Sequence, residues 1–411
     1  MKKKKSFDII AKGGVTSPKG FKASGICAGI KKSGKDDMAL IYSEVPALFS
    51  GAFTSCLFEA APVTLCKERL ASDSKFRAVI INSGNANACT GTPGYKNAQK
   101  MSEITAAELS VAPENVLVSS TGRIGVQLPM PVIKHGIKLA AAALSEKGGD
   151  KAAKAIMTTD TRPKESAVSI KINGKKVTIG GMTKGAGMIA PKLNVPHATM
   201  LTYITTDADI GKPLLRALMS EGVNRSFNCV TIDGDTSTND TVLLIANGSS
   251  GVSIKKGTKE AALFAEALYF VMEDLAKQIV YDGEGMTKFV TVTVNNAASA
   301  KDAELCARSV ASSLLCKTAW FGSDPNWGRV LAAAGYSGAT FKPEKFSLDY
   351  DEKPVVRNGQ DAGTPEKALA KLMKRPEFTV KIDLNAGKHS HTIWTNDISY
   401  EYVEINADYH T

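Results

Sequence analysis

Residues with hydroxyl, amide and amino side chains gather in four glycine- or threonine-rich segments that the sequence predicts to include loops. These segments are SSTGRIG (119–125), TTDTRPK (158–164), TKGAGMIAP (183–191) and HATMLTYITTDA (197–208). Their hydroxyl groups can act as nucleophiles, and their N–H and ammonium groups can bind negative charge. The chain has only five histidines, so few are available to form a histidine-based triad or a zinc site. The chemistry that these segments offer is that of hydroxyl, amide and amino groups.

Several familiar catalytic and cofactor motifs are absent from the sequence. There is no G-x-x-x-x-G-K-[ST] phosphate loop and no H-E-x-x-H metal motif, and KGAGMIAP (184–191) lacks the spacing of a dinucleotide-binding loop. The segment GYSG (335–338) misses the G-x-S-x-G nucleophile elbow by one residue. These absences argue against the enzyme classes that depend on those motifs.

The charge and hydropathy of the chain limit its expected partners. Its 411 residues carry a formal net charge of +10, of which the lysines at positions 2–5 supply four, so the remainder carries +6. No basic stripe with interleaved aromatic residues occurs, and we therefore expect no nucleic-acid partner. The lysine run is followed by Ser6, Phe7 and Asp8 instead of an apolar segment, and no run of 18 apolar residues occurs. We expect a cytoplasmic protein with no membrane partner.

Apolar periodicity predicts both helices and strands. Helical spacing marks the ranges 94–110, 131–146, 212–226, 258–285 and 301–320. Alternation about Asn173 and Gly174 predicts a β-hairpin, and a second hairpin is predicted about residues 385–387. Residues 1–75 favour strands and turns over helices.

Two predicted buried strands end in polar residues and are expected to deliver loops to a site. They are RAVIINSGNANA (77–88) and NVLVSSTGRIG (115–125). Along the chain, strands and helices come in paired runs instead of strict β-α-β alternation. We therefore predict an α+β fold with helices layered on mixed or antiparallel sheets.

A series of short blocks resembles the ornithine acetyltransferase family, also called the glutamate N-acetyltransferase family. The blocks follow one another through essentially the whole chain, so chance agreement is negligible. They are NSGNANACTG (82–91), STG (120–122), TTDT (158–161), KGAGMIAP (184–191), ATML (198–201), IDGDTSTND (232–240), DGEGMTKF (282–289), SDPNWGR (323–329) and TNDISYEYVEINADYHT (395–411). The resemblance implies a self-cleaving architecture like that of the hydrolases with a threonine nucleophile.

The resemblance implies that the chain cuts its own backbone between Ala198 and Thr199. Cleavage there gives an α chain (1–198), which carries the oxyanion hole and substrate loops, and a β chain (199–411), which carries the nucleophile and the C-terminal substrate segment. The Thr199 hydroxyl can attack the preceding carbonyl in an N→O shift, and water can open the resulting ester. The new α-amine, with an unperturbed pKa of about 7.7–8.0, is then a base attached to its own nucleophile. Taken without the family, this pair of residues is only the start of a strand.

The resemblance also assigns roles in binding and catalysis. Thr121 and Gly122 match an oxyanion hole made of one hydroxyl and one backbone N–H, although taken alone they are a strand-end turn. The positions that match substrate-binding residues are Thr161, Lys184, Thr199, Glu284, Asn406 and Thr411. Lys184 can pair with an α-carboxylate, and Glu284 can receive an ammonium group or move a proton.

Two features leave this assignment open in places. Any of the threonines within 158–161 can fill the role that the family gives to Thr161. The segment KLNVPH (192–197) adds roughly four residues to the family's usual spacing immediately before the cut, where a longer loop is tolerated at low cost. Slower cleavage, or His197 beside the nucleophile, are the alternatives.

The activity implied by the resemblance is ping-pong acetyl transfer in arginine biosynthesis. N-acetylornithine acylates Thr199, ornithine leaves, and glutamate takes the acetyl group as N-acetylglutamate. No metal and no cofactor is implied, and some members of the family also use acetyl-CoA as the acetyl donor. A heterotetramer of two α and two β chains is also implied. The alternatives are a threonine-nucleophile amidase or aminopeptidase, and an uncleaved, non-catalytic paralogue that binds amino acids.

Overall fold

The computed structural model describes residues 6–72, 74–191 and 200–408, which form two compact units. Among these residues, 6–228 and 236–279 make the first unit, and 229–235 with the chain from 280 onward make the second. Each unit has its own sheet and its own hydrophobic core, and each combines helices with strands. The predicted α+β class is confirmed.

Nine described strands of the first unit form one continuous sheet in the order β1-β6-β7-β8-β10-β3-β4-β5, with β2 also paired to β3. The strands are β1 (Asp8–Ile9), β2 (Phe21–Ile26), β3 (Met38–Phe53), β4 (Phe76–Asn85), β5 (Val116–Arg123), β6 (Lys164–Ile172), β7 (Lys175–Lys184), β8 (Leu201–Thr206) and β10 (Thr241–Ala246). The pairs β8–β10 and β4–β5 are parallel, and the other pairs are antiparallel. The sheet is therefore mixed, and β6 and β7 form the hairpin predicted about Asn173 and Gly174.

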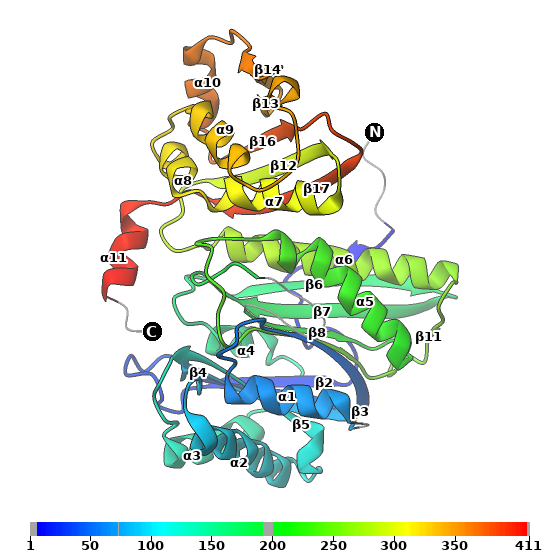
Figure 1. Cartoon of the computed structure of the whole chain (residues 1–411). Helices are drawn as coiled ribbons and strands as arrows, with labels where there is room; N and C mark the ends of the chain where they lie inside the picture. Colours follow the sequence, from blue (N-terminus) through cyan, green and yellow to red (C-terminus); the bar gives the residue numbers. More distant parts are fainter. Residues whose placement is uncertain (1–5, 73, 192–199, 409–411) are drawn as a thin grey trace. The chain divides into compact units, whose positions relative to one another are not determined.

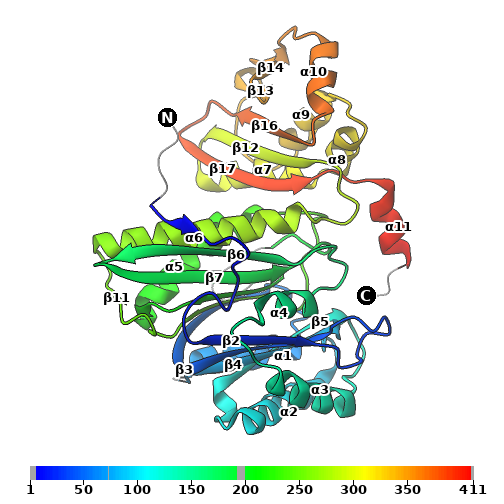
Figure 2. The same ribbon diagram turned by 180° about the vertical axis from the view of Figure 1, so that it is seen from behind.

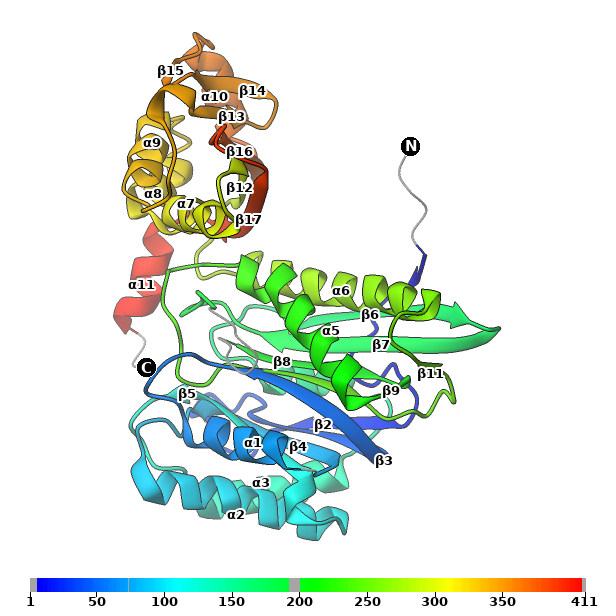
Figure 3. The ribbon, with the colours of Figure 1, turned by 45° about the vertical axis from the view of Figure 1, so that its right-hand side comes forward.

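The long strand β3 carries this sheet from one layer into a second. Its first part, Met38 to Tyr42, pairs with β2 and β4, and its last part, Leu48 to Phe53, pairs with β10. The register with β4 shifts between Tyr42 and Ala47, and such an irregularity lets a strand bend. The layer of β2, β4 and β5 consequently faces the layer of β6, β7 and β8 (Figures 1 and 3).

Helices cover the outer face of each layer, so that the first unit has four layers (Figure 1). These helices are α1 (Ala61–Ala71), α2 (Gly91–Leu109), α3 (Met130–Ala142), α5 (Lys212–Arg225) and α6 (Lys259–Val280). The short helix α4 (Gly149–Ala155) instead packs against strands of both layers and adds its alanines to the core between them. The short strands β9 (Asp209–Ile210) and β11 (Ser253–Ile254) pair separately. Between the two sheet layers, Phe21 and Ile41 share a core with Tyr203 and Leu243. Burying a side chain of this size contributes about 1.5–3 kcal/mol, and this central core sets how the strand ends of the two layers face each other.

The second unit is built on a six-stranded sheet with the order β15-β14-β13-β16-β12-β17 (Figure 2). Its strands are β12 (Phe289–Ala297), β13 (Ser347–Tyr350), β14 (Lys353–Arg357), β15 (Gln360–Asp361), β16 (Glu377–Asp383) and β17 (His389–Asn396). Its helices are α7 (Ala300–Ser312), α8 (Leu314–Phe321), α9 (Trp327–Gly335), α10 (Glu366–Met373) and α11 (Tyr400–Asp408). Val292, Trp320 and Tyr350 lie in its core, whereas α11 contributes no buried residue.

The second predicted hairpin, about residues 385–387, is wrong. Strands β16 and β17 do flank that turn, but β12 lies between them, parallel to β16 and antiparallel to β17. Alternation of apolar and polar residues records which side of a strand is buried. It does not record which strand is the neighbour.

Two helix predictions also need correction. Residues 1–75 contain the helix α1, whose buried Val63 and Leu70 lie seven positions apart on one face, in a segment too short to show clear periodicity. The helix predicted over 301–320 is divided into α7 and α8 because Ser313 has an extended backbone and its hydroxyl caps the second helix. None of the described helices is long and apolar enough to span a membrane.

Candidate active site

The parallel neighbours β4 and β5 end side by side, and a glycine is required where they meet. Gly84 and Gly122 are register partners, and a Cβ atom on Gly122 would lie 2.4 Å from the carbonyl carbon of Gly84. Gly122 also has φ +128°, a conformation that L side chains rarely adopt. The predicted oxyanion residues, Thr121 and Gly122, thus lie on a strand end whose close approach to its neighbour excludes any side chain at position 122.

Buried polar side chains fix the ends of these two strands. The Ser120 hydroxyl donates to Asn82 Oδ1 at 2.6 Å, and Asn82 Nδ2 donates to the carbonyl of Asn85 at 2.8 Å. Asn239 Nδ2 donates to the carbonyls of Ala86 and Ser120 at 2.5 and 2.8 Å. An unpaired buried amide costs about 1–3 kcal/mol, so this network selects one arrangement of the strand ends.

Lys184 brings an ammonium group from the facing layer to Thr121. It is the last residue of β7, only 8% exposed, and its Nζ lies 3.4 Å from Thr121 Oγ1. Two residues to which the sequence gave different roles, oxyanion donor and carboxylate partner, therefore meet in the described structure. A hydroxyl and an ammonium group at one place can together hold an anionic or strongly polarised oxygen.

Asp160 organises the charges around Lys184. Its carboxylate accepts from Lys164 Nζ at 2.6 Å, from the backbone N–H of Gly185 at 2.7 Å and from that of Thr158 at 2.9 Å. Burial by itself would raise the pKa of Asp160, but the positive charges of Lys164 and Lys184 outweigh burial and hold the pKa well below its usual range. Asp160 is therefore ionised, and it anchors the peptide group that follows Lys184.

A third lysine lies near the same group of charges. Lys31 Nζ donates to the carbonyls of Asp36 and Met157 at 2.8 and 2.7 Å. Burial, with the charge of Lys184, lowers the pKa of Lys31 to about 8 against the opposing effect of Asp37. Lys31, Lys164 and Lys184 thus lie near one another, with the carboxylate of Asp160 among them.

The substrate threonine predicted within 158–161 lies on the loop that Asp160 holds. Thr161 is exposed, whereas Thr158 and Thr159 are half-buried. Which of these hydroxyls binds a substrate remains a prediction.

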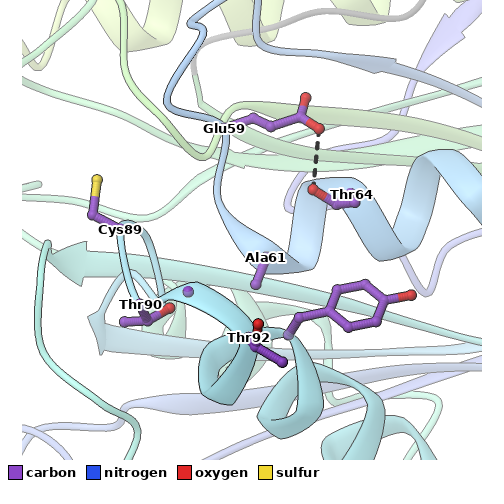
Figure 4. A pocket seen from close by; sticks show the side chains of 8 residues that line it. Glu59, Ala61, Thr64, Cys89, Thr90 and Thr92 are labelled. Atoms are coloured by element: carbon purple, nitrogen blue, oxygen red, sulfur yellow. Dashed lines mark hydrogen bonds between the residues drawn. The ribbon is translucent and has the colours of Figure 1, made fainter.

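A pocket of about 360 Å³ opens near the starts of α1 and α2 (Figure 4). Its lining residues are Glu59, Ala61, Thr64, Cys89, Thr90, Gly91, Thr92 and Tyr95. The Thr64 hydroxyl donates to Glu59 Oε1 at 3.0 Å. None of the residues predicted to act in catalysis or substrate binding lines this pocket.

In the second unit, the structure brings together two further predicted residues, Glu284 and Asn406. Asn406 Nδ2, on α11, donates to Glu284 Oε2 at 2.7 Å, and Glu284 is only 7% exposed. The neighbouring Gly285 has φ +63°, and a Cβ atom there would lie 2.6 Å from Ser399 Oγ. The pair of side chains is thus held where two chain segments pass closely.

Hydrogen bonds fasten these two segments to each other. The carboxylate of Asp397 accepts from the backbone N–H groups of Thr287 and Lys288 at 2.8 and 3.0 Å. The Ser399 hydroxyl donates to the carbonyl of Gly285 at 2.6 Å. Asp397 and Ser399 therefore fix the position at which α11 begins, and with it the position of Asn406 on that helix.

Three predicted residues lie outside the described part of the chain. They are Ala198 and Thr199, at the predicted cut, and Thr411; the segment 192–197 with His197 also lies outside it. The nearest described residue after the predicted nucleophile is Met200. Within the described ranges, no group of three or more His, Cys, Asp or Glu side chains is placed to hold a metal ion.

Lys31, Asp160, Asn239 and Asp240 were not among the residues predicted from the sequence to act in the site. Three of these lie inside TTDT and IDGDTSTND, two of the blocks that carry the resemblance. The blocks therefore pointed to these positions, but they implied no role for them. Lys31 lies in no such block, and only the tertiary structure places it near Lys184.

Comparison with known proteins gives a consistent result over nearly the whole chain. The model of the ArgJ family matches residues 22–411. The chain is 48% identical over 402 residues to the arginine biosynthesis bifunctional protein ArgJ of Symbiobacterium thermophilum, covering 97% of this chain and 99% of that protein. It is 46% identical over 408 residues to the glutamate N-acetyltransferase of Methanocaldococcus jannaschii, covering 97% and 99%.

A solved structure with a similar sequence is the ornithine acetyltransferase of Mycobacterium tuberculosis complexed with ornithine. The two chains are 41% identical, and the match covers 46% of this chain and all of that chain (100%), with a TM-score of 0.43.

Proposed function

The chain belongs to the ArgJ family, and from this membership we propose that it is an N-acetyltransferase that moves an acetyl group from N-acetylornithine to glutamate. The observation that carries the proposal is the 3.4 Å contact between Lys184 and Thr121. It joins the predicted carboxylate partner to the predicted oxyanion donor, with Lys31 and Lys164 nearby. Both substrates carry an α-carboxylate, and both half-reactions develop an oxyanion.

We propose that the enzyme first processes itself. Thr199 Oγ attacks the carbonyl carbon of Ala198, the peptide C–N bond breaks, and the amine of Thr199 is released while an ester forms. Water then cleaves the ester, leaving the carboxylate of Ala198 and a free Thr199 with both its hydroxyl and its α-amine. The α chain is then 1–198 and the β chain 199–411.

Acetyl transfer then takes place in two half-reactions. The α-amine of Thr199 accepts the hydroxyl proton as Oγ attacks the acetyl carbonyl of N-acetylornithine, and the amide C–N bond breaks as the proton passes to the departing ornithine amine. The amine of glutamate next attacks the acetyl ester, and N-acetylglutamate leaves with Thr199 restored. In each half-reaction the Thr121 hydroxyl and the Gly122 N–H donate to the oxyanion. This route needs no metal and no cofactor.

Roles for the remaining residues follow from their chemistry. Lys184 pairs with a substrate carboxylate, Thr161 donates a hydrogen bond to it, and Glu284 with Asn406 receives the side-chain ammonium group of ornithine. We assign Thr411 to the same substrate site on the basis of the resemblance. The proposed assembly contains two α and two β chains.

The proposal is tested first on a denaturing gel. Wild-type protein should give two fragments near 20 kDa, with the second beginning Thr-Met-Leu, and Thr199→Ala should stay a single chain. A single wild-type band would favour the uncleaved amino-acid-binding paralogue.

The second test follows the acetyl group. Purified protein with N-acetylornithine and labelled glutamate should form N-acetylglutamate without added coenzyme A. If acetate release outpaces N-acetylglutamate formation at saturating glutamate, the amidase alternative holds. Replacing N-acetylornithine by acetyl-CoA in the same assay tests the second proposed acetyl donor.

A further inference from the structure

Lys317, on α8, is a buried lysine to which the reaction outlined above gives no role. It is 1% exposed, and its Nζ donates to Thr395 Oγ1 at 2.9 Å, to Asn396 Oδ1 at 3.0 Å and to the backbone carbonyl of Asn396. These three acceptors match the three N–H donors of an ammonium group. Burial lowers the pKa of Lys317 to about 7, against the opposing charges of Asp233 and Asp397. Because burying an amino group is costly, a lysine kept here calls for a reason beyond packing.

The amide that Lys317 holds lies against the chain segment that carries Glu284. A Cβ atom on Gly283 would lie 2.5 Å from Asn396 Nδ2, so the Asn396 side chain covers the backbone directly before Glu284. In the sheet, Asn396 is also the register partner of Phe289, the first residue of β12. The residue with which Lys317 makes two of its hydrogen bonds therefore meets the segment 283–289 at both of its ends.

The same end of β17 leads into the helix that carries Asn406. Asp397 and Ser399 hold the backbone of residues 285–288, and α11 begins directly after Ser399. From α11, Asn406 Nδ2 donates to Glu284 Oε2 at 2.7 Å. The positions of Glu284 and Asn406 thus both depend on the end of β17, and Lys317 ties that strand end to α8.

We propose that Lys317 is a positioning residue for the pair Glu284 and Asn406, because its hydrogen bonds hold the strand end on which both side chains depend. The inference rests on the function proposed above, in which this pair receives the side-chain ammonium group of ornithine. Lys317 is almost wholly buried, so it acts through the pair and not on the substrate directly. Its loss should weaken the binding of N-acetylornithine and ornithine, and it should affect glutamate little, because glutamate has no side-chain ammonium group.

The second unit offers a matched control in its own hydrophobic core. Leu348, on β13, is fully buried, and β16 and β12 separate its strand from β17. Leu348→Ala leaves a cavity in the core and should lower Tm, but it removes no hydrogen bond from the end of β17. This variant therefore measures what reduced stability of the second unit does by itself.

The experiment compares Lys317→Met, Asn406→Ala, the double variant and Leu348→Ala in the full chain. On cleaved protein it measures Tm, kcat, KM for N-acetylornithine and for glutamate, and the Kd of ornithine by calorimetry. Lys317→Met keeps an apolar stem but cannot donate. We expect it to raise KM for N-acetylornithine and Kd for ornithine about tenfold, with kcat and KM for glutamate within about threefold of wild type. Leu348→Ala should lower Tm and leave both KM values and Kd unchanged.

The double variant tests whether Lys317 acts through the pair. Two residues that serve the same contact have effects that do not add, so the double variant should bind ornithine no more than about threefold more weakly than the weaker single variant. Should Lys317→Met not fold, Asn396→Ala replaces it with the same expectation, because it removes both the acceptor Oδ1 and the amide that lies against Gly283.

Four results would overturn the inference. They are wild-type KM and Kd values in folded, cleaved Lys317→Met, an equal rise of its KM for glutamate, the same loss of ornithine binding in Leu348→Ala, and single effects that multiply to about a hundredfold in the double variant. Failure of the proposed function is recognised separately, because wild-type protein itself would then transfer no acetyl group.

Discussion

Asp160 and Asp240 both lie near the ammonium group of Lys184, yet their surroundings shift the pKa values of the two carboxyl groups in opposite directions. Asp160 keeps a low pKa because Lys164 and Lys184 outweigh burial, whereas for Asp240 burial outweighs every opposing contact. Carboxyl groups whose pKa values are pushed apart in this way take different roles. The ionised Asp160 anchors a lysine and a backbone turn.

At the same scale, the hydroxyl of Thr121 should matter chiefly in the transition state. Thr121→Ala should lower kcat by about 10²-fold and leave KM within a few-fold, because an oxyanion donor acts mainly on the tetrahedral intermediate. Steady-state kinetics on cleaved protein measures this. Thr121→Ser, which retains the hydroxyl, is the control and should recover most of the activity; an unchanged kcat in the alanine variant would remove Thr121 from the site.

The half-buried Glu165 should make stability depend on pH. Burial and the nearby Asp150 raise its pKa from 4.5 to about 7, against the effect of Lys154. Between those two pH values the folded chain holds a proton that the unfolded chain has lost, so this group makes the free energy of unfolding fall as pH rises from about 4.5 to 7. Glu165→Gln should therefore raise Tm at pH 8, with the gain shrinking toward pH 5.

Thermal unfolding at several pH values checks this prediction. The exposed Glu108→Gln on α2 serves as the matched control and should follow wild type throughout. A Glu165→Gln variant whose Tm parallels wild type from pH 5 to 8 would show that Glu165 does not have the raised pKa.

At the scale of elements, α11 is positioned by hydrogen bonds more than by apolar burial. None of its residues is buried, and its start is set by the Ser399 and Asp397 contacts with residues 285–288. Asn406 then reaches Glu284 from the last turn of the helix. An element held in this way can be removed with little effect on the core of the second unit.

Deleting residues 406–411 should abolish acetyl transfer while leaving self-cleavage and Tm close to wild type. Asn406→Ala, which loses the hydrogen bonds to Glu284 and to the carbonyl of Tyr402, should raise KM for N-acetylornithine by about tenfold or more, because a hydrogen bond to a charged group contributes about 1.5–3 kcal/mol. Steady-state kinetics on both variants is the measurement. A truncated, cleaved enzyme with near-wild-type kcat/KM would show that the C-terminal segment takes no part in the site.

At the scale of the whole chain, the proposed cut does not separate the two compact units. The β chain contributes β8 and β10 to the first unit, and in the sheet these two strands lie between β7 and β3 of the α chain. Six residue pairs join β7 to β8, and six join β10 to β3. After cleavage the two chains therefore share one sheet and one core.

The two fragments should consequently stay together under native conditions. Size-exclusion chromatography of cleaved protein should give one peak that contains both fragments, and they should separate only in denaturant, because parting them would break two strand pairings and expose the shared core. The uncleaved Thr199→Ala variant, run in parallel, provides the reference elution volume. Separation in native buffer would contradict the strand order.

Much of the fold could be predicted because it depends on local pattern. Helix spacing predicted α2, α3, α5 and α6, and the Asn173-Gly174 turn predicted the pairing of β6 with β7. The second hairpin failed because β12, distant in sequence, supplies the neighbour of both β16 and β17. Pairing between distant segments leaves no mark in either segment's own alternation.

What the sequence by itself determined is the residue types available for chemistry, the family that they resemble and most of the elements that carry them. Only the tertiary structure decided that Lys184 meets Thr121, that Asp160 holds the turn after Lys184 and that Asp240 is buried beside Met200. These contacts join residues that are distant in sequence. The contact between Lys184 and Thr121, for example, joins two strand ends from facing layers. Burial and neighbouring charge, and therefore the protonation state of each carboxyl, exist only once those layers have packed.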